Sequence, residues 1–260
     1  MSEGGFADVR RFATLGSTNA YLLEKARRGA PAGAVAVTDH QTAGRGRLGR
    51  RWEAPPGTCL LVSVLLRPVL EPDRLHLGTA LVALAAADAC QRAAGVVPAV
   101  KWPNDLLSGG RKLAGVLAES DPAAPGGPPG SVAVVVGVGV NVTWPGPEGA
   151  GGTSLSDEAG RPVDREVVLA AFLAAMRRRS PALGSPAGRR ALAGELRRRC
   201  STVGSPVRVA LAGRQVVGTA VDLTDAGHLV VETAAGGGRE EVAAGDVVHL
   251  RPSGDAPGAR

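Results

Sequence analysis

The sequence predicts a mixed α/β domain of about two hundred residues followed by a small β-barrel. In the first part, apolar runs with helical spacing alternate with short β-branched runs. From Gly204 onwards only short strand-like runs occur, broken by Gly- or Asp-containing turns, which is typical of a barrel of about fifty residues. Hydrophobic residues make up 44% and charged residues 21% of the 260 residues, a globular composition that excludes wholesale disorder.

Membrane insertion, secretion and disulfide bonding are all disfavoured. No stretch approaches about 18 uncharged apolar residues, and the N-terminal MSEGGFADVRRF lacks the basic and apolar parts of a signal peptide. Cys59, Cys90 and Cys200 are widely spaced and odd in number, so they make neither a disulfide framework nor a zinc site. We therefore expect a cytoplasmic protein without a membrane partner.

The net charge of +6 favours an anionic partner such as nucleic acid or a nucleotide phosphate. Among the 30 basic residues only Lys25, Lys101 and Lys112 are lysine. A lysine that persists among so many arginines suggests a place that needs a compact ammonium, with chance survival as the simpler alternative.

Helix-capping residues and glycines predict where the helices of the first part begin and end. Ser17-Thr18-Asn19 offers N-caps to a helix that ends at Gly29, and the longest helix is expected over 73–94, between an Asp73 cap and Gly95. Strands are expected at 34–40, 59–68, 99–102, 112–119 and 131–142. We interpret the Gly/Pro segment 121–130, before the last strand, as a mobile hairpin loop.

A second helical region is expected over 164–200, with Asp164 as the first cap. The runs Arg177–Arg179 and Arg197–Arg199 come at helix ends, where cations complement the helix dipole, and we interpret them as solvated faces. A nucleic-acid patch is the weaker alternative, because no aromatic residues are interleaved with them. The barrel strands are expected at 207–211, 215–223, 228–233 and 246–250, and the tail 253–260 is expected to be disordered.

The strongest chemical signal is the run GRGRLGR at residues 44–50. It contains a G-x-G-x-x-G pattern, but a dinucleotide-binding motif should open a helix, and two prolines in WEAPPG follow instead. Three arginines interleaved with three glycines indicate a flexible cationic loop that can hold carboxylate or phosphate oxygens. Arg51 and Trp52 add a further charge and a flat apolar surface. An ordinary surface loop is the alternative.

Two further motifs carry polar groups or glycines. In KWPNDL (101–106), Asn104 and Asp105 lie at a turn, and Lys112 starts the next strand, so its ammonium should lie close to them across a hairpin. Turn chemistry alone would also explain them. In GVGVNV (137–142), two glycines indicate that something approaches the sheet closely, with simple strand packing as the alternative. Without a catalytic triad or a metal-ligand cluster, these residues favour nucleotide-dependent activation of an acid by electrostatics and positioning, not covalent catalysis.

In order and spacing, these motifs resemble those of biotin–protein ligases. The matching motifs are Ser17-Thr18-Asn19, QTAGRGRLGRRW (41–52), KWPNDL, RKLAG (111–115), GVGVNV and Thr153-Ser154-Leu155, and the resemblance covers roughly 9–252. It implies an α+β fold: a biotin–lipoate ligase catalytic domain (1–203), related to class II aminoacyl-tRNA synthetases, and an SH3-like C-terminal β-barrel (204–252). It also implies two reaction steps. Biotin and MgATP give biotinyl-5′-AMP and pyrophosphate, and biotin then passes to a lysine of the biotin carboxyl carrier domain of an acyl-CoA carboxylase.

The resemblance also implies roles for individual residues. The catalytic residues are expected to be Arg47, Asp105 and Lys112. The biotin-binding residues are expected to be Ser17, Thr18, Asn19, Gln41, Gly44, Arg45, Gly46, Arg47, Lys112 and Gly115. The ATP- or adenylate-binding residues are expected to be Arg47, Arg50, Trp52, Asn104, Lys112 and Asn141. Asp105 would orient or deprotonate the acceptor amine, whose free pKa is about 10.4. Mg²⁺ is expected to enter on the ATP phosphates, with protein ligands unknown, and the role of Lys101 stays open.

One departure from the family and two alternatives complete the prediction. Bifunctional members place a winged helix-turn-helix domain before the Ser-Thr-Asn motif, and Ser17 leaves no room for it, so we expect a ligase that does not bind DNA. Family members include monomers and dimers, so a homodimer stays open. The alternatives are a nucleic-acid-binding or repressor protein, suggested by the charge, and a lipoate ligase or octanoyltransferase of the same superfamily. The latter lack the GRGRxGR–KWPND pairing, and their ligand has no ureido ring.

Overall fold

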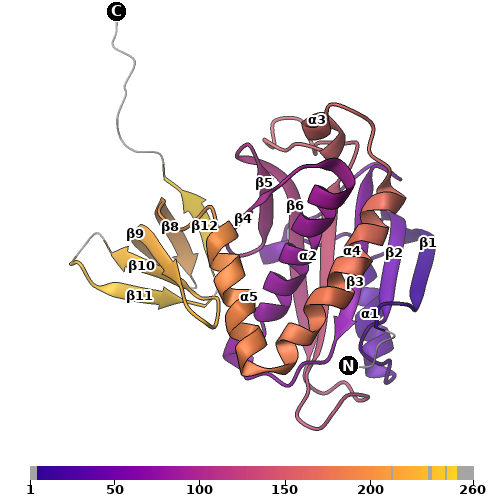
Figure 1. Cartoon of the computed structure of the whole chain (residues 1–260), viewed down its shortest axis with the longest axis horizontal. Helices are drawn as coiled ribbons and strands as arrows, with labels where there is room; N and C mark the ends of the chain where they lie inside the picture. The colour runs from indigo at the N-terminus through magenta and orange to yellow at the C-terminus, as the bar shows by residue number, and fades with distance from the viewer. Residues whose placement is uncertain (1–4, 212, 234–235, 244, 251–260) are drawn as a thin grey trace, which may run out of the picture.

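The computed structural model describes residues 5–211, 213–233, 236–243 and 245–250. The tail 253–260, predicted to be disordered, lies outside the described residues. The chain forms a seven-stranded sheet with helices on both faces and a separate five-stranded sheet near its C-terminal end (Figure 1). This arrangement confirms the predicted mixed α/β fold with a small C-terminal β unit.

The large sheet has the strand order β1-β2-β3-β7-β6-β5-β4, in which β1 is parallel to β2 and all other neighbours are antiparallel. Its strands are β1 (Val9–Leu15), β2 (Val35–Gln41), β3 (Cys59–Leu66), β4 (Ala99–Lys101), β5 (Asp105–Ser108), β6 (Arg111–Asp121) and β7 (Ala133–Asn141). The sequence analysis did not identify β1 or β5. β1 lies at the sheet edge with mostly exposed side chains, so it lacks the apolar alternation that marks a half-buried strand.

Helices cover both faces of this sheet (Figure 1). They are α1 (Thr18–Arg27), α2 (Leu77–Ala94), α3 (Leu155–Ala159), α4 (Arg165–Arg179) and α5 (Pro186–Arg199). α1 packs on one face. On the other face α2 packs against alternate valines of β7, and α4 packs beside α2 and against β3. The predicted caps Ser17 and Asp164 are confirmed. Within the described residues, no helix combines the length and apolar character needed to cross a membrane.

The longest helix begins four residues later than predicted. Asp73 does not cap α2 but lies in a 3-10 turn at Pro72–Arg74, and α2 begins at Leu77. The backbone carbonyl of Asp73 accepts a hydrogen bond from the His228 ring at 2.8 Å, so a contact with the C-terminal sheet holds this segment outside the helix. Gly95 ends α2 as predicted, with a φ of 76°.

The C-terminal sheet is antiparallel, with the order β11-β10-β9-β8-β12. Its strands are β8 (Pro206–Leu211), β9 (Arg214–Leu223), β10 (Leu229–Thr233), β11 (Arg239–Val242) and β12 (Asp246–His249). The sequence analysis did not identify β11, whose REEV sequence is too polar to stand out as a strand. Trp102 links the two sheets, because its indole N–H donates to the carbonyl of Gly227 at 3.0 Å.

The Gly/Pro segment 121–130 connects β6 and β7 as the predicted hairpin, but it is anchored to α1. The buried Arg67 guanidinium donates to the carbonyls of Ala26, Ala30 and Ala124, which joins the end of α1 to this segment. Burial lowers the pKa of Arg67 from its ordinary value. Three carbonyl acceptors therefore compensate a buried cation, and one of them, that of Ala124, belongs to the Gly/Pro segment.

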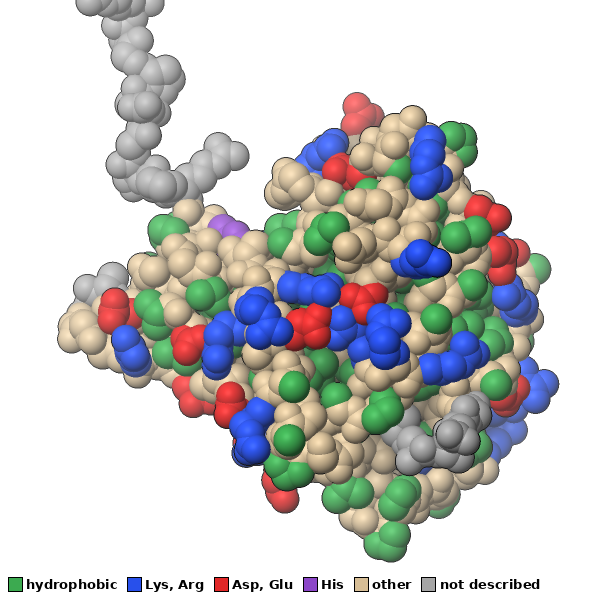
Figure 2. Space-filling model, viewed as in Figure 1, with side chains coloured by type: hydrophobic (Ala, Val, Ile, Leu, Met, Phe, Trp, Pro, Cys, Tyr) green, Lys and Arg blue, Asp and Glu red, His purple; other side chains and the backbone are tan. Residues whose placement is uncertain are grey.

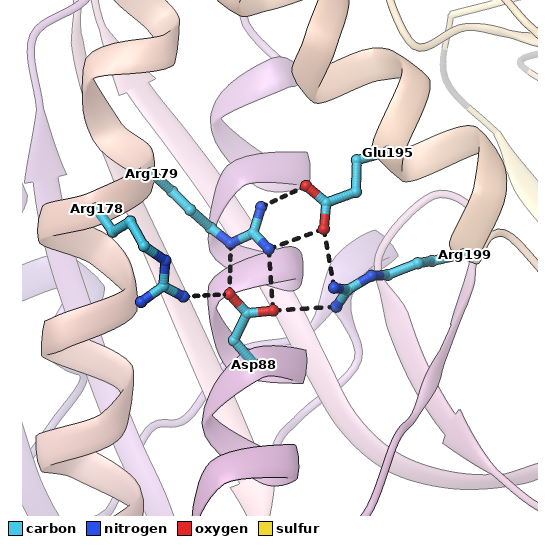
Figure 3. A network of polar contacts seen from close by, with 5 residues as sticks. All are labelled: Asp88, Arg178, Arg179, Glu195 and Arg199. Atoms are coloured by element: carbon cyan, nitrogen blue, oxygen red, sulfur yellow. Dashed lines mark hydrogen bonds and ion pairs between the residues drawn. The ribbon is translucent and has the colours of Figure 1, made fainter.

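The arginine runs at the ends of α4 and α5 form ion pairs. Figure 2 shows basic and acidic side chains interspersed across the face that α2, α4 and α5 cover. Within it, Asp88 of α2 accepts from Arg178, Arg179 and Arg199, and Glu195 also pairs with Arg179 and Arg199 (Figure 3). The Arg179 side chain is only 13% exposed, so the prediction of a solvated face is wrong for this residue. Its carboxylate partners let it enter the interface between three helices.

Asp88→Asn should lower the free energy of unfolding by about 3 kcal/mol at pH 7, because three guanidiniums then converge on a neutral group. Burial raises the pKa of Asp88, but hydrogen bonds and charge from Arg179, with help from Arg178 and Arg199, outweigh it and leave that pKa below its ordinary value. The stabilisation is therefore complete above about pH 4 and is lost as the pH falls through the folded pKa.

Urea titrations at pH 7 and pH 3 would measure this difference. The gap between wild type and Asp88→Asn should narrow at pH 3; an equal gap at both pH values would contradict the assignment. Asp8→Asn is the control, because the pair between Asp8 and Arg10 is exposed, and its cost should stay below about 0.5 kcal/mol.

Candidate active site

One cavity of about 140 Å³ collects most of the residues that the sequence analysis singled out. It lies on the α1 face of the large sheet, between the start of α1, residues 44–52, the β5–β6 hairpin and the start of β12. The predicted residues that line it are Ser17, Thr18, Asn19, Gln41, Arg45, Gly46, Arg47, Arg50, Trp52, Asn104, Asp105, Lys112 and Gly115. The start of α1 and the start of β12, near opposite ends of the chain, thus meet in one place.

The floor of the cavity is bare backbone. Gly115 of β6 pairs with Gly139 of β7, and the Trp52 ring lies over both. A Cβ atom at Gly139 would lie 2.6 Å from the indole, and one at Gly115 would lie 3.0 Å from it. Of the two readings of GVGVNV, close approach to the sheet is therefore confirmed.

The start of α1 forms the polar end of the cavity. The Ser17 hydroxyl accepts from the N–H of Ala20 as the helix cap, so its own hydrogen is available to a ligand. The Gln41 side-chain oxygen accepts from the backbone N–H and the hydroxyl of Thr18, at 2.9 and 3.1 Å. That arrangement leaves the Gln41 amide N–H groups as donors at the cavity wall.

Residues 44–51, which we call the arginine loop, have a defined fold. The backbone of Arg45 bridges that of Arg51, and a 3-10 turn at Arg47–Gly49 forms the tip. Leu48 at this tip is 72% exposed and has a φ of 55°, a conformation that glycine adopts more readily. Gly44 lies behind the cavity, where a Cβ would come within 2.3 Å of the Trp52 carbonyl oxygen.

The C-terminal sheet supplies partners for this loop. Arg50 forms an ion pair with Asp246 at 2.5 Å, and Arg47 donates to the carbonyl of Gly245 at 3.0 Å and to the Asn104 side chain at 3.3 Å. Burial lowers the pKa of the Arg47 guanidinium, and Arg50 lowers it further, whereas Asp246 and Asp105 oppose the shift. Arg47 nevertheless stays charged at neutral pH, so the loop presents cations that are partly shielded from water.

Lys112 and Asp105 form the other charged pair of the cavity. Their Nζ and Oδ1 atoms are 2.8 Å apart across the β5–β6 hairpin, which confirms the predicted proximity. The Lys112 ammonium also lies 5.7 Å from the centroid of the Trp52 ring, within cation–π range. The pair therefore holds a compact cation and a carboxylate beside the glycine floor.

Two other predicted residues act from outside the cavity. The buried Asn141 amide lies within hydrogen-bond distance of the carbonyls of Lys112, Pro145 and Thr153, so it ties β6 to the segment after β7. It does not line this cavity. Lys101 in β4 also lies outside the cavity wall.

The sequence analysis missed Asp246 and Glu119, which pair with Arg50 and Arg45 respectively. Asp246 begins β12 and Glu119 lies within β6, and neither has a local sequence signal that would identify it without the fold.

All three cysteines are free and buried. Burial raises the pKa of the Cys59 thiol to about 11 and that of Cys90 to about 12, so both stay protonated and are poor nucleophiles. In the part of the chain that the structure describes, no cluster of three or more His, Cys, Asp or Glu side chains is placed to hold a metal ion.

The sequence and the fold both match known ligases. The biotin/lipoate A/B protein ligase family matches residues 12–141, and the biotin protein ligase C-terminal domain matches residues 202–250. The biotin–[acetyl-CoA-carboxylase] ligase of Mycobacterium tuberculosis is 41% identical over 254 residues, covering 95% of this chain and 91% of its own. The bifunctional ligase/repressor BirA of Escherichia coli is 29% identical, covering 88% and 70%. A solved biotin protein ligase of Aquifex aeolicus, in complex with biotin and ATP, superposes with a TM-score of 0.78 at 25% identity, covering 95% and 100%.

These matches agree with a site built from loop cations, a Lys–Asp pair and a polar helix end, and they define an enzyme of the ligase class. The chain belongs to the biotin/lipoate A/B protein ligase family, and within it to the biotin protein ligases.

Gly139→Ala should displace the Trp52 ring, because the new Cβ would overlap the indole. We expect a loss of about 2 kcal/mol in the free energy of unfolding and an altered near-ultraviolet circular dichroism spectrum. Gly184→Ala is the matched control, since a Cβ there meets open space. A Gly139→Ala protein with wild-type stability and spectrum would refute the close packing of Trp52 on β7.

Proposed function

We propose that this enzyme joins biotin to a carrier protein in two steps. Biotin and MgATP first give biotinyl-5′-AMP and pyrophosphate, and biotin is then transferred to one lysine of a biotin carboxyl carrier domain. The observation that carries the proposal is the single cavity in which the arginine loop and Lys112 lie opposite the polar start of α1. Two relatives support the proposal: the biotin–[acetyl-CoA-carboxylase] ligase of M. tuberculosis and the A. aeolicus ligase solved with biotin and ATP.

The residues suit the chemistry of adenylation. A carboxylate is a poor electrophile, and it must approach an α-phosphate that is also an anion. Arg45, Arg47 and Lys112 would neutralise both groups and stabilise the charge that develops between them. Arg50 would hold the pyrophosphate that leaves, and Trp52 and Asn104 would pack beside the nucleotide. Magnesium enters as part of the MgATP substrate, through the phosphates.

The polar start of α1 would select biotin. A ureido ring presents one carbonyl acceptor and two N–H donors, and the hydroxyls of Ser17 and Thr18 together with Gln41 offer both kinds of partner. A lipoyl dithiolane ring has no such groups, so burying these side chains against it would leave them unpaired.

We assign residues 1–203 to the catalytic domain and 204–252 to a C-terminal domain that completes the site through Gly245 and Asp246. We place the reaction in the cytoplasm, a reducing compartment that suits three free, buried cysteines.

Biotin-dependent exchange of pyrophosphate into ATP tests the first step. Lys112→Arg should lower this exchange by about 100-fold or more, because the planar guanidinium cannot take the place of a compact ammonium between Asp105 and Trp52. Arg47→Ala should be similarly impaired while keeping the fold. The matched control is Lys25→Arg on α1, whose ammonium lies over Tyr21 and outside the cavity. Exchange with lipoate but not with biotin would overturn the proposed substrate.

Asp105→Ala should impair transfer at least as much as adenylation, because its carboxylate would orient or deprotonate the acceptor amine. Single-turnover transfer from preformed biotinyl-5′-AMP to a carrier domain, measured beside pyrophosphate exchange, separates the two steps. A loss confined to biotin binding would contradict this role.

A further inference from the structure

Glu119 of β6 joins the two ends of the site. Its Oε1 accepts from Arg45 of the arginine loop at 3.1 Å, and its Oε2 accepts from the Asn19 side chain of α1 at 2.9 Å. The Glu119 side chain is 24% exposed and lies behind the loop, in a hollow that residues 43–51 line with it. One carboxylate therefore spans the gap between helix and loop.

We call the contacts Asn19–Glu119–Arg45 the bridge, and Asn19 is its rigid end. Its amide nitrogen donates to the Leu117 carbonyl at 3.1 Å as well as to Glu119, and its oxygen accepts from the Ser63 hydroxyl at 2.6 Å. These three contacts use both amide hydrogens, and Asn19 and Ser63 are buried. The space for the side chain depends on Gly137, where a Cβ would lie 2.3 Å from the Asn19 oxygen. Asn19 therefore has no amide hydrogen left for a ligand.

Arg45, at the loop end of the bridge, has by contrast few contacts that hold its side chain. The Arg45 side chain is 51% exposed, and Glu119 is the acid that pairs with it in the structure. A charge-assisted hydrogen bond between a fixed carboxylate and an exposed guanidinium can set the position of the residue that carries the cation. The expected effect of Glu119 therefore falls on the arginine loop and not on the fold of the sheet.

We propose that Glu119 is a positioning residue for the reaction: it holds Arg45, and with it the arginine loop, in the position seen in the structure by linking the loop to Asn19. The catalytic part of this inference depends on the function proposed above. Glu119 itself does not line the main cavity, so it acts through Arg45.

Glu119→Gln tests the bridge, because the amide keeps the shape but can accept from only one of the two donors. Trypsin cleaves after arginine, so cleavage within residues 45–51 of the ligand-free protein reports how often the loop opens. We expect cleavage to accelerate about fivefold or more, the change expected for one lost charge-assisted hydrogen bond. The matched control is Asp121→Asn on the same strand, which breaks the pair with Arg27 of α1 and should leave loop cleavage unchanged.

The exchange reaction separates positioning from a general structural role. A loosened loop should raise the KM for biotin about fivefold in Glu119→Gln and change kcat less than twofold, since Arg45 is held less often in place while Arg47, Arg50 and Lys112 remain. A fall in kcat with unchanged KM would indicate loss of folded enzyme and would overturn the proposal. Wild-type rates of loop cleavage would overturn it as well. If the wild-type protein shows no biotin-dependent exchange, the proposed function fails, while the cleavage rates still decide the role of Glu119.

Asn19→Ala tests the anchor. It should accelerate loop cleavage as Glu119→Gln does, and the double variant should add nothing further, because both changes break one bridge. Additive effects, or wild-type cleavage in Asn19→Ala, would show that Arg45 is not held through Asn19.

Discussion

The site depends on three glycines of the large sheet, where the absence of a side chain leaves room for other residues. Gly115, Gly137 and Gly139 lie on adjacent strands of the α1 face, and each is the only residue type that leaves room for what lies above it. Trp52 occupies the space over Gly115 and Gly139, and Asn19 occupies the space beside Gly137. Because the Lys112 ammonium lies within cation–π range of Trp52, its position depends on the absence of a Cβ atom at Gly115 and Gly139.

Charge pairing organises the rest of the cavity. Each of three cations that would meet phosphate or carboxylate oxygens has a protein carboxylate beside it: Arg45 with Glu119, Arg50 with Asp246, and Lys112 with Asp105. The acids come from β6, β12 and β5, so three separate elements fix cations that lie on a glycine-rich loop and a strand. Pairing limits repulsion among the cations in a partly enclosed space and keeps them oriented for a ligand. Many of the basic residues are thus paired with acids, including the three arginines around Asp88.

Much of this could be predicted from sequence because the motifs are local. Caps, glycines and β-branched runs located most helices and strands, and the Lys112–Asp105 contact followed from a short hairpin. What escaped prediction depends on partners far along the chain. Asp73 does not cap α2 because the His228 ring bonds its carbonyl. Arg179 is largely shielded from solvent because Asp88 and Glu195 accept its hydrogen bonds, and the Asn141 amide bonds backbone carbonyls. Asp246 and Glu119 carry no local signature, because only tertiary contact makes them part of the site.

The ion pair between Arg50 and Asp246 also sets an order of events during synthesis. The two residues are 196 positions apart, and a chain emerges from the ribosome N-terminal end first. The arginine loop, the large sheet and all the helices therefore leave the ribosome before β12 is made. One wall of the cavity, and the carboxylate that steadies Arg50, arrive only with this last strand. A nascent chain can thus acquire most of its fold while the site is still incomplete.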